Sequence, residues 1–124
     1  MPGSEGGMFK AKMQFPEDFP NSPPELRFTS QFWHPNVHKE DGKVCISILH
    51  PPGDDPHHYE LAEERWRPIH SIESVLLSVI AMISDPNDES PANVDAAKQW
   101  RDNPDEYKKV VGRLVRRSQE EAFD

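Results

Sequence analysis

The chain has 124 residues, 35% of them hydrophobic, one cysteine and a formal net charge of -8 at pH 7, which predicts one domain over residues 1–124 with a modest core. The negative charge excludes a general nucleic-acid binder, which needs a basic field, and no apolar run is long enough for a membrane span. One cysteine excludes an internal disulfide and a cysteine-rich zinc site, so we expect a reducing compartment, the cytoplasm or nucleus.

Two short strands are predicted in the first quarter of the chain. Residues 9–15 alternate apolar and polar side chains, which is typical of a strand with one face on a core. Prolines break residues 16–24, after which Leu26 and Phe28 indicate a second strand. Two strands alone are not stable in water, so the sheet must pack against something else.

Three helices are predicted in the second half. Ser71 can cap the first, and apolar side chains cover most of the circumference of residues 72–83, so this helix should cross the core. Asn93 can cap a short second helix over residues 96–100. Asn103 can cap the third, which has a proline at its first helical position.

The outer face of the last helix is basic, opposite in sign to the chain as a whole. Its cations are Lys108, Lys109, Arg113, Arg116 and Arg117. Cations toward the end of a helix suit its dipole, and we interpret this face as a solvated helix surface.

The only cysteine, Cys45, lies in the largely apolar stretch of residues 42–49, nine residues after Asn36. A lone cysteine close after an amide side chain can be a nucleophile whose developing oxyanion needs a donor. Inert packing is the alternative, because free cysteine is among the most buried residue types. A cysteine hydrolase is a third interpretation, because the chain has six histidines and one of them could act as the general base of Cys45. No histidine stands at a position that indicates this role.

Four short motifs follow one another along the chain. They are His34-Pro35-Asn36, the stretch Gly42-Lys43-Val44-Cys45-Ile46-Ser47-Ile48-Leu49, Trp66-Arg67-Pro68 and Asp85-Pro86-Asn87. In this order they resemble the ubiquitin-conjugating enzymes, which hold ubiquitin as a cysteine thioester, and the similarity runs from about Gly6 to the end. The resemblance implies the ubiquitin-conjugating (UBC) fold, an α+β fold with a short antiparallel sheet packed on a central helix and further helices at the C-terminus.

The resemblance also implies a transferase that needs no cofactor. Cys45 would take ubiquitin from a ubiquitin-activating enzyme and pass it to lysines of protein substrates. Asn36 would donate to the oxyanion, with loop bracing as the competing role, and Ser90 would gate the incoming lysine. Three further residues would support the motif and the closed state: His34, Pro35 and Asn87.

Two partner surfaces are implied in the same way. Donor ubiquitin would fold back onto the helix face of Ser74, Leu77 and Ala81, where periodicity alone would favour close packing against a neighbouring element. A RING-type ubiquitin ligase would bind two loops. The residues implied there are Asn21, Trp66, Pro68 and Ile69. Asn21 departs from the large apolar side chain that many relatives have at its position.

Trp66 follows Cys45 by 21 residues, which leaves a 13-residue insertion relative to common family members. The insertion includes Asp54, Asp55 and Glu60, and it is similar to the acidic loop of the Ubc7/Cdc34-like branch, which is associated with lysine-48-type chains and proteasomal degradation. A solvated insertion without a role is the alternative. Neighbouring histidines show no recognised metal-ligand spacing, so no metal site is expected.

Family members have a helix and about one and a half strands before the position of Gly6, so the resemblance implies a UBC fold shortened at its N-terminus. In the family that helix binds the activating enzyme. We therefore expect poor charging, and a marginal monomer or self-association through the uncovered strand. A catalytically impaired ubiquitin-system binding module is the alternative to an active enzyme.

Overall fold

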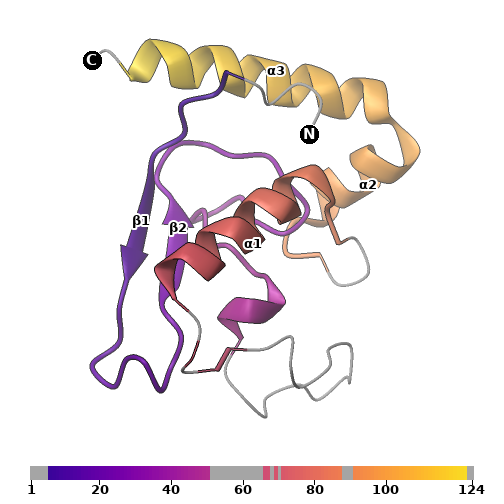
Figure 1. Ribbon diagram of the computed structural model, residues 1–124. Coiled ribbons are helices and arrows are strands. Elements are labelled where there is room, and N and C mark those ends of the chain that lie inside the picture. Colours follow the sequence, from indigo (N-terminus) through magenta and orange to yellow (C-terminus); the bar gives the residue numbers. More distant parts are fainter. Residues whose placement is uncertain (1–5, 51–65, 68, 70, 88–90, 123–124) are drawn as a thin grey trace.

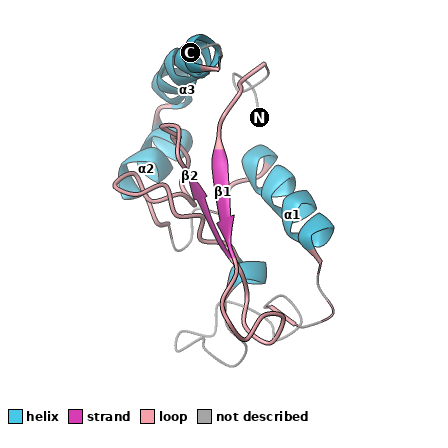
Figure 2. Ribbon diagram, turned by 90° about the vertical axis from the view of Figure 1, so that its left-hand side faces the viewer, coloured by secondary structure: helices cyan, strands magenta, loops and turns pink. Residues whose placement is uncertain are grey.

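The computed structural model describes residues 6–50, 66–67, 69, 71–87 and 91–122. Its elements are β1 (Ala11–Gln14), β2 (Glu25–Phe28), the 3-10 helix η1 (Ser47–Leu49), α1 (Ile72–Ser84), α2 (Val94–Asp102) and α3 (Pro104–Glu121). Figure 1 shows α3 running across one end of the molecule. Figure 2 shows the two strands between α1 on one side and α2 on the other. The predicted α+β class is therefore confirmed.

The sheet is an antiparallel pair in which Ala11 of β1 faces Phe28 of β2. Leu26 and Phe28 are buried, as expected for a strand with one face on the core. β1 is shorter than the predicted residues 9–15, and Phe15, expected on the core face, is 44% exposed. Phe15 follows the strand and packs edge-to-face on Phe19, with ring centroids 4.8 Å apart, instead of entering the core.

The main core joins β2, η1, α1 and the loops between them. Its buried members are Leu26, Phe28, Phe32, Val37, Val44, Ile48, Leu49, Trp66, Val75, Val79 and Met82. Phe32 is central, because it stacks on Phe28 at 4.1 Å and meets Phe9 edge-on at 4.8 Å. Burying a large apolar side chain contributes about 1.5–3 kcal/mol, so this cluster fixes α1 against β2.

α1 begins at the predicted cap. The hydroxyl of Ser71 accepts the amide of Ser74, and the hydroxyl of Ser74 accepts the amide of Ser71. These reciprocal bonds satisfy two backbone donors that have no partner inside the helix. Val75 and Val79 form the inner face together with Met82.

One flank of α1 differs from the prediction. Ile72, Leu76 and Ile80, expected to be covered, are 51%, 46% and 61% exposed. The main core includes only Val75, Val79 and Met82 of α1, with Ile83 packed against it, and Ile72, Leu76 and Ile80 are not among its members.

α2 and α3 build a second, smaller core. Its buried members are Ala96, Tyr107, Val111 and Val115. Both helices begin at their predicted caps: Asn93 Oδ1 accepts the amide of Ala96 at 3.0 Å, and Asn103 Oδ1 accepts the amide of Glu106 at 3.4 Å. Each cap satisfies a backbone donor in the first turn of its helix.

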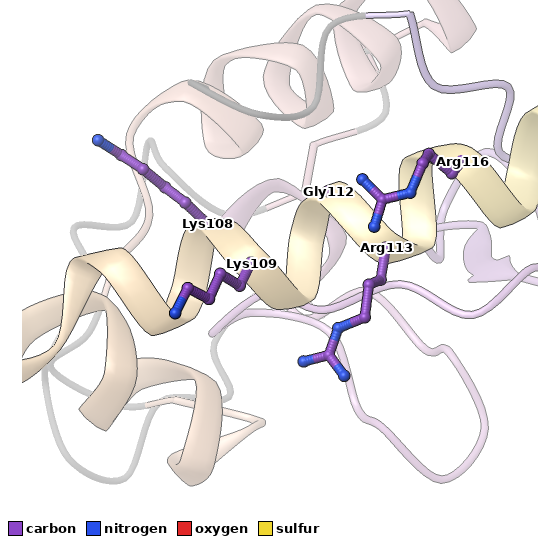
Figure 3. Close-up of a pocket in the computed structure, with 5 residues that line it drawn as sticks. All are labelled: Lys108, Lys109, Gly112, Arg113 and Arg116. Atoms are coloured by element: carbon purple, nitrogen blue, oxygen red, sulfur yellow. The ribbon is translucent and has the colours of Figure 1, made fainter.

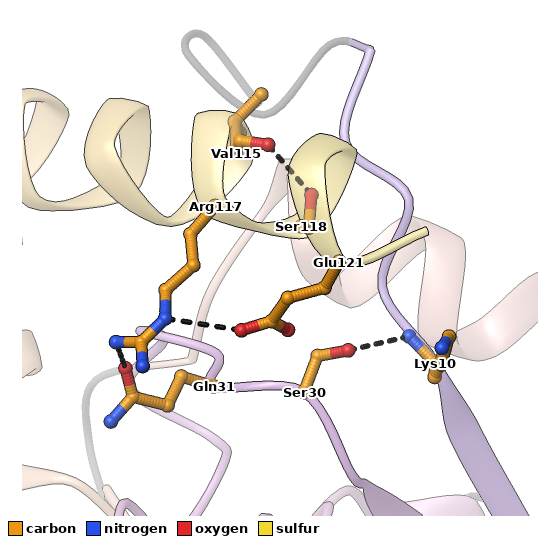
Figure 4. A network of polar contacts seen from close by, with 7 residues as sticks. All are labelled: Lys10, Ser30, Gln31, Val115, Arg117, Ser118 and Glu121. Atoms are coloured by element: carbon orange, nitrogen blue, oxygen red, sulfur yellow. Dashed lines mark hydrogen bonds and ion pairs between the residues drawn. The ribbon is translucent and has the colours of Figure 1, made fainter. Parts of the chain in front are cut away.

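Polar contacts fasten α3 to the N-terminal half of the chain (Figure 4). The buried hydroxyl of Ser118 accepts the amide of Met8 at 3.0 Å. Arg117 donates to Gln31 Oε1 at 2.9 Å and pairs with Glu121 at 3.1 Å. These contacts, together with the second core, define which side of α3 faces the protein and which side faces water.

Candidate active site

His34 anchors the centre of the site. It is 0% exposed, and its Nε2 lies 2.9 Å from the carbonyl oxygen of Met82 near the end of α1. Because a carbonyl can only accept, Nε2 holds the ring proton, and Nδ1 accepts the amide of Asn36 at 3.0 Å. Burial lowers the pKa of His34 to about 4, so the ring is neutral near pH 7.

The next two residues hold the segment between α1 and α2. Asn36 is 4% exposed, and its side chain bonds twice to the backbone of Asn87: Nδ2 donates to the carbonyl at 2.7 Å, and Oδ1 accepts the amide at 2.9 Å. The carbonyl of Pro35 accepts the amides of Ala92 and Asn93 at 2.9 and 3.0 Å. Buried polar groups are costly when unpaired, so these bonds fix the path of the connection.

Cys45 lies directly beside this segment, since its amide donates to the carbonyl of Asn36 at 2.8 Å. Its side chain is half-buried. Burial raises the pKa of the thiol above its ordinary value, while the positive charge of Lys43 acts in the opposite direction with a smaller effect. The thiol is therefore mostly protonated near neutral pH.

A tight turn over residues 38–42 positions Cys45. The amide of Gly42 donates to the carbonyl of His38, and the amide of His38 donates to the carbonyl of Lys43, both at 2.9 Å. Gly42 has φ of 76°, and a Cβ there would fall on the carbonyl oxygen of Phe28, so a side chain does not fit. The nine-residue step from Asn36 to Cys45, one residue longer than is usual in the family that the motifs resemble, predicts a bulge over residues 38–41, and the structure has its turn there. Sequence reasoning did not single out Lys43, whose charge acts on the thiol.

The described residues give Cys45 no general base. No described histidine hydrogen-bonds its sulfur, and both ring nitrogens of His34 are already engaged. A cysteine hydrolase needs a base within hydrogen-bond reach of its nucleophile. The arrangement suits a thiol that receives and passes on an acyl group better than one that hydrolyses a bond.

The α1 face predicted to receive donor ubiquitin is open. Leu77 is 59% exposed, Ala81 is exposed and Ser74 is half-buried. Among the described residues nothing packs over Leu77, so the alternative of close packing against a neighbouring element does not describe this face.

The predicted ligase-binding residues divide into two kinds. Asn21 is exposed and Ile69 is 78% exposed, so both are accessible to a partner. Trp66 is only 1% exposed, and its Nε1 donates to the carbonyl of Pro20 at 2.8 Å. Because it is buried, the side chain of Trp66 is not available to a partner, and its contact with Pro20 positions the loop that contains Asn21.

Several predicted residues lie outside the described part of the chain: Ser90, Pro68, Asp54, Asp55 and Glu60. In the described part, no three His, Cys, Asp or Glu side chains lie close enough together to hold a metal ion. None of the helices in that part combines the length and the apolar character needed to cross a bilayer.

Comparison with known proteins identifies the family. The family model described as "Ubiquitin-conjugating enzyme" matches residues 4–115. The chain belongs to the ubiquitin-conjugating enzyme family. "Ubiquitin-conjugating enzyme E2 7" of Arabidopsis thaliana is 68% identical over 116 residues, which are 94% of this chain and 69% of the relative. "Ubiquitin-conjugating enzyme E2 15" of Schizosaccharomyces pombe is 64% identical over 114 residues, 92% of this chain and 68% of the relative.

A solved structure supports the same assignment. The E2 domain of a ubiquitin conjugating enzyme from Toxoplasma gondii superimposes with a TM-score of 0.76 at 29% sequence identity, over 92% of this chain and 71% of that one. The predicted UBC fold and the predicted enzyme class, transfer through a cysteine thioester, are thus confirmed at the level of the family. The relatives named E2 7 also confirm the resemblance to the Ubc7 group.

The buried His34 should make the protein sensitive to mild acid. The unfolded chain takes up a proton on this ring below its ordinary pKa of 6.5, whereas the folded protein resists protonation until about pH 4. Stability is complete above pH 6.5 and is lost as the pH falls toward 4. We expect the free energy of unfolding in urea to be about 2 kcal/mol lower at pH 5 than at pH 7.5 because of this group.

NMR titration of the imidazole provides the control for that measurement. The ring of His34 should stay neutral, with the proton on Nε2, between pH 7.5 and pH 5, over which the stability is compared. A folded-state ring that titrates near 6.5 would contradict the assignment.

Proposed function

We propose that this chain acts as a ubiquitin-conjugating enzyme that holds ubiquitin as a thioester on Cys45. The supporting observation is that the only cysteine of a family member is half-buried, accessible, and bonded through its amide to the buried Asn36. Residues 1–124 would act as one domain. A function that depends on a free thiol requires a reducing compartment, the cytoplasm or nucleus.

Charging exchanges one thioester for another. The sulfur of Cys45 attacks the carbonyl carbon that joins the ubiquitin C-terminus to the cysteine of the activating enzyme. A new S–C bond forms, the old one breaks, and the departing thiol takes up the proton that Cys45 loses. A lysine amine later attacks the new thioester, forms an amide bond and releases Cys45 as a thiol. Dividing the acyl transfer into two exchanges lowers the barrier of each.

The surroundings of Cys45 bear mainly on the second step, the transfer to lysine. A thiol with a raised pKa is a slower leaving group, so its thioester persists until an amine arrives. Aminolysis develops an oxyanion that needs a neutral donor. Asn36 uses one Nδ2 hydrogen on Asn87 and has a second that is not engaged in the described part, so it can brace the loop and donate at the same time. Ser90 would gate the approaching lysine.

Three classes of protein partner follow from this role: a ubiquitin-activating enzyme, a RING-type ubiquitin ligase and the lysine-bearing substrates. For the ligase we propose the two loops that contain Asn21 and Ile69, both of which are exposed. Trp66 would act indirectly, because its bond to Pro20 fixes one loop against the other.

The decisive test of this proposal concerns Cys45. Incubation with activating enzyme, ATP and ubiquitin, followed by non-reducing electrophoresis, should show a ubiquitin adduct that thiol reductant removes. Cys45→Ser should give an oxygen ester that resists reductant, and Cys45→Ala should give no adduct. A reductant-sensitive adduct on Cys45→Ala would show that the thioester forms elsewhere. No adduct on the unaltered chain would favour a binding module.

Donor ubiquitin should rest on the open face of α1. Leu77→Arg places a charge at the centre of that face, so discharge of ubiquitin to free lysine should slow about tenfold, since an apolar anchor contributes about 1.5–3 kcal/mol. Charging should be unaffected, because only the closed state uses this face.

Leu76→Arg is the matched control for Leu77→Arg. It changes a leucine of similar exposure, 46% against 59%, about 100° around the same helix and away from Ser74 and Ala81. Equal slowing by both variants, or a loss of charging by Leu77→Arg alone, would argue against a donor-binding role.

We further propose that the enzyme builds lysine-48-type chains for proteasomal degradation, as the 13-residue acidic insertion within the stretch of residues 51–65 suggests. Its carboxylates, among them Asp54, Asp55 and Glu60, would attract and orient the acceptor lysine, an effect that salt screens. Deleting the insertion should reduce lysine-48 chain formation several-fold and leave charging intact, as measured with single-lysine ubiquitin. Unchanged chain formation would leave the insertion without this role.

A further inference from the structure

The outer side of α3 contains a basic hollow of about 320 Å³ (Figure 3). The residues that line it are Lys108, Lys109, Gly112, Arg113 and Arg116, which we call the α3 basic groove. Figure 3 shows the four cationic side chains spread around the bare stretch of helix at Gly112. Four positive charges thus lie within about two and a half turns of one helix, although the net charge of the chain is -8.

The four cations have no acidic partner in the part of the chain that the structure describes. Within the described residues none of them forms an ion pair or a side-chain hydrogen bond, and all four are exposed. Arg117, the next cation in the helix, behaves differently, because it is held by Glu121 and Gln31. The positive potential of the groove is therefore available to an external anion.

Gly112 has no packing reason to be glycine. In a helix interior glycine is less stable than alanine, because it loses more conformational entropy on folding. A Cβ at this position would meet only the guanidinium of Arg116, at an ordinary contact distance of 3.8 Å. The missing side chain opens the floor of the groove, so a ligand can approach the helix backbone between the cations.

The surrounding surface discriminates between anionic ligands. A nucleic-acid duplex would extend beyond the groove into the field of a chain with 22 acidic and 14 basic residues, and phosphate binding needs a basic field over its whole footprint. A membrane surface binds helices that add large apolar side chains to their cations, and none of the large exposed apolar residues in the described part lies on α3. A short ligand feels mainly the local charge, because screening limits the field to about 8 Å.

We propose that the α3 basic groove binds a short acidic peptide segment of a partner protein. Lys108 and Arg116 are separated by about 12 Å along the helix axis, the length of about four extended residues. Carboxylates along such a segment can each reach one cation, and arginine can bind a carboxylate with two parallel bonds.

This surface is separate from the thiol chemistry. Figure 1 shows α3 at one end of the molecule and η1, which follows Cys45 by two residues, toward the other. Binding at the groove does not depend on a thioester, and it can be measured on the free protein.

The test uses fluorescence anisotropy with a labelled hexapeptide of alternating glutamate and aspartate, and a glutamine and asparagine hexapeptide as the neutral control. The acidic peptide should bind, and raising the salt from about 50 to about 300 mM should weaken it several-fold. The double variant Lys109→Glu, Arg113→Glu should bind it at least about tenfold more weakly. Lys12→Glu, Lys98→Glu makes the same change of net charge outside the groove and should alter the affinity less than about twofold.

Gly112→Ala separates the shape of the groove from its charge. It should raise the melting temperature, because alanine favours the helix, and weaken peptide binding by about threefold or more. Equal weakening by the two double variants would overturn the proposal. So would absence of acidic-peptide binding, or tighter binding to anionic lipid vesicles or a DNA duplex. Unchanged affinity in Gly112→Ala would overturn the part assigned to the open floor.

Discussion

The buried segment of residues 34–36 is the constraint on which the site depends. His34 bonds to the end of α1, Asn36 to the backbone of Asn87, and Pro35 to the two residues directly before α2. One short segment therefore determines where α1 ends, how the chain leaves it and where α2 starts. Each bond is modest, about 0.5–1.5 kcal/mol net, but leaving a buried group such as His34 unpaired costs more.

The same segment determines the chemistry of Cys45. The bond from its amide to the carbonyl of Asn36 fixes the backbone of Cys45 beside this segment, and the turn closed by Gly42 precedes it by three residues. Partial burial keeps the thiol protonated, and no histidine in the described part is positioned to activate it. A cysteine that is accessible but not activated fits an enzyme that passes ubiquitin on, because a strongly activated thiol would also release it readily.

Local signals in the sequence predicted the helices well. Ser71, Asn93 and Asn103 cap the helices as expected, because a cap depends only on residues three positions away. The four motifs predicted the family, and Cys45 and Asn36 prove to be neighbours through a backbone bond.

Features that depend on long-range contacts could not be predicted from the sequence. The exposed Leu76 has the same apolar character as its buried neighbour Val75, and only the tertiary packing of α1 on the main core decides which one is covered. Trp66, expected on a partner surface, is buried in the main core and bonds to Pro20, 46 positions earlier. The two hydrogen bonds between the side chain of Asn36 and the backbone of Asn87 span 51 positions and likewise have no local signal.

Amide hydrogen exchange at Asn87 tests most directly whether residues 34–36 hold the site together, because the amide of Asn87 bonds to Oδ1 of Asn36. In Asn36→Ala the exchange rate of the Asn87 amide should rise at least about tenfold, since this amide loses its bond to Asn36 Oδ1. The amide of Val75, which bonds to Ser71 within the capped start of α1, should exchange as before and reports that the fold is intact. An Asn87 amide that keeps its original rate in a folded Asn36→Ala protein would show that residues 34–36 do not hold the site together.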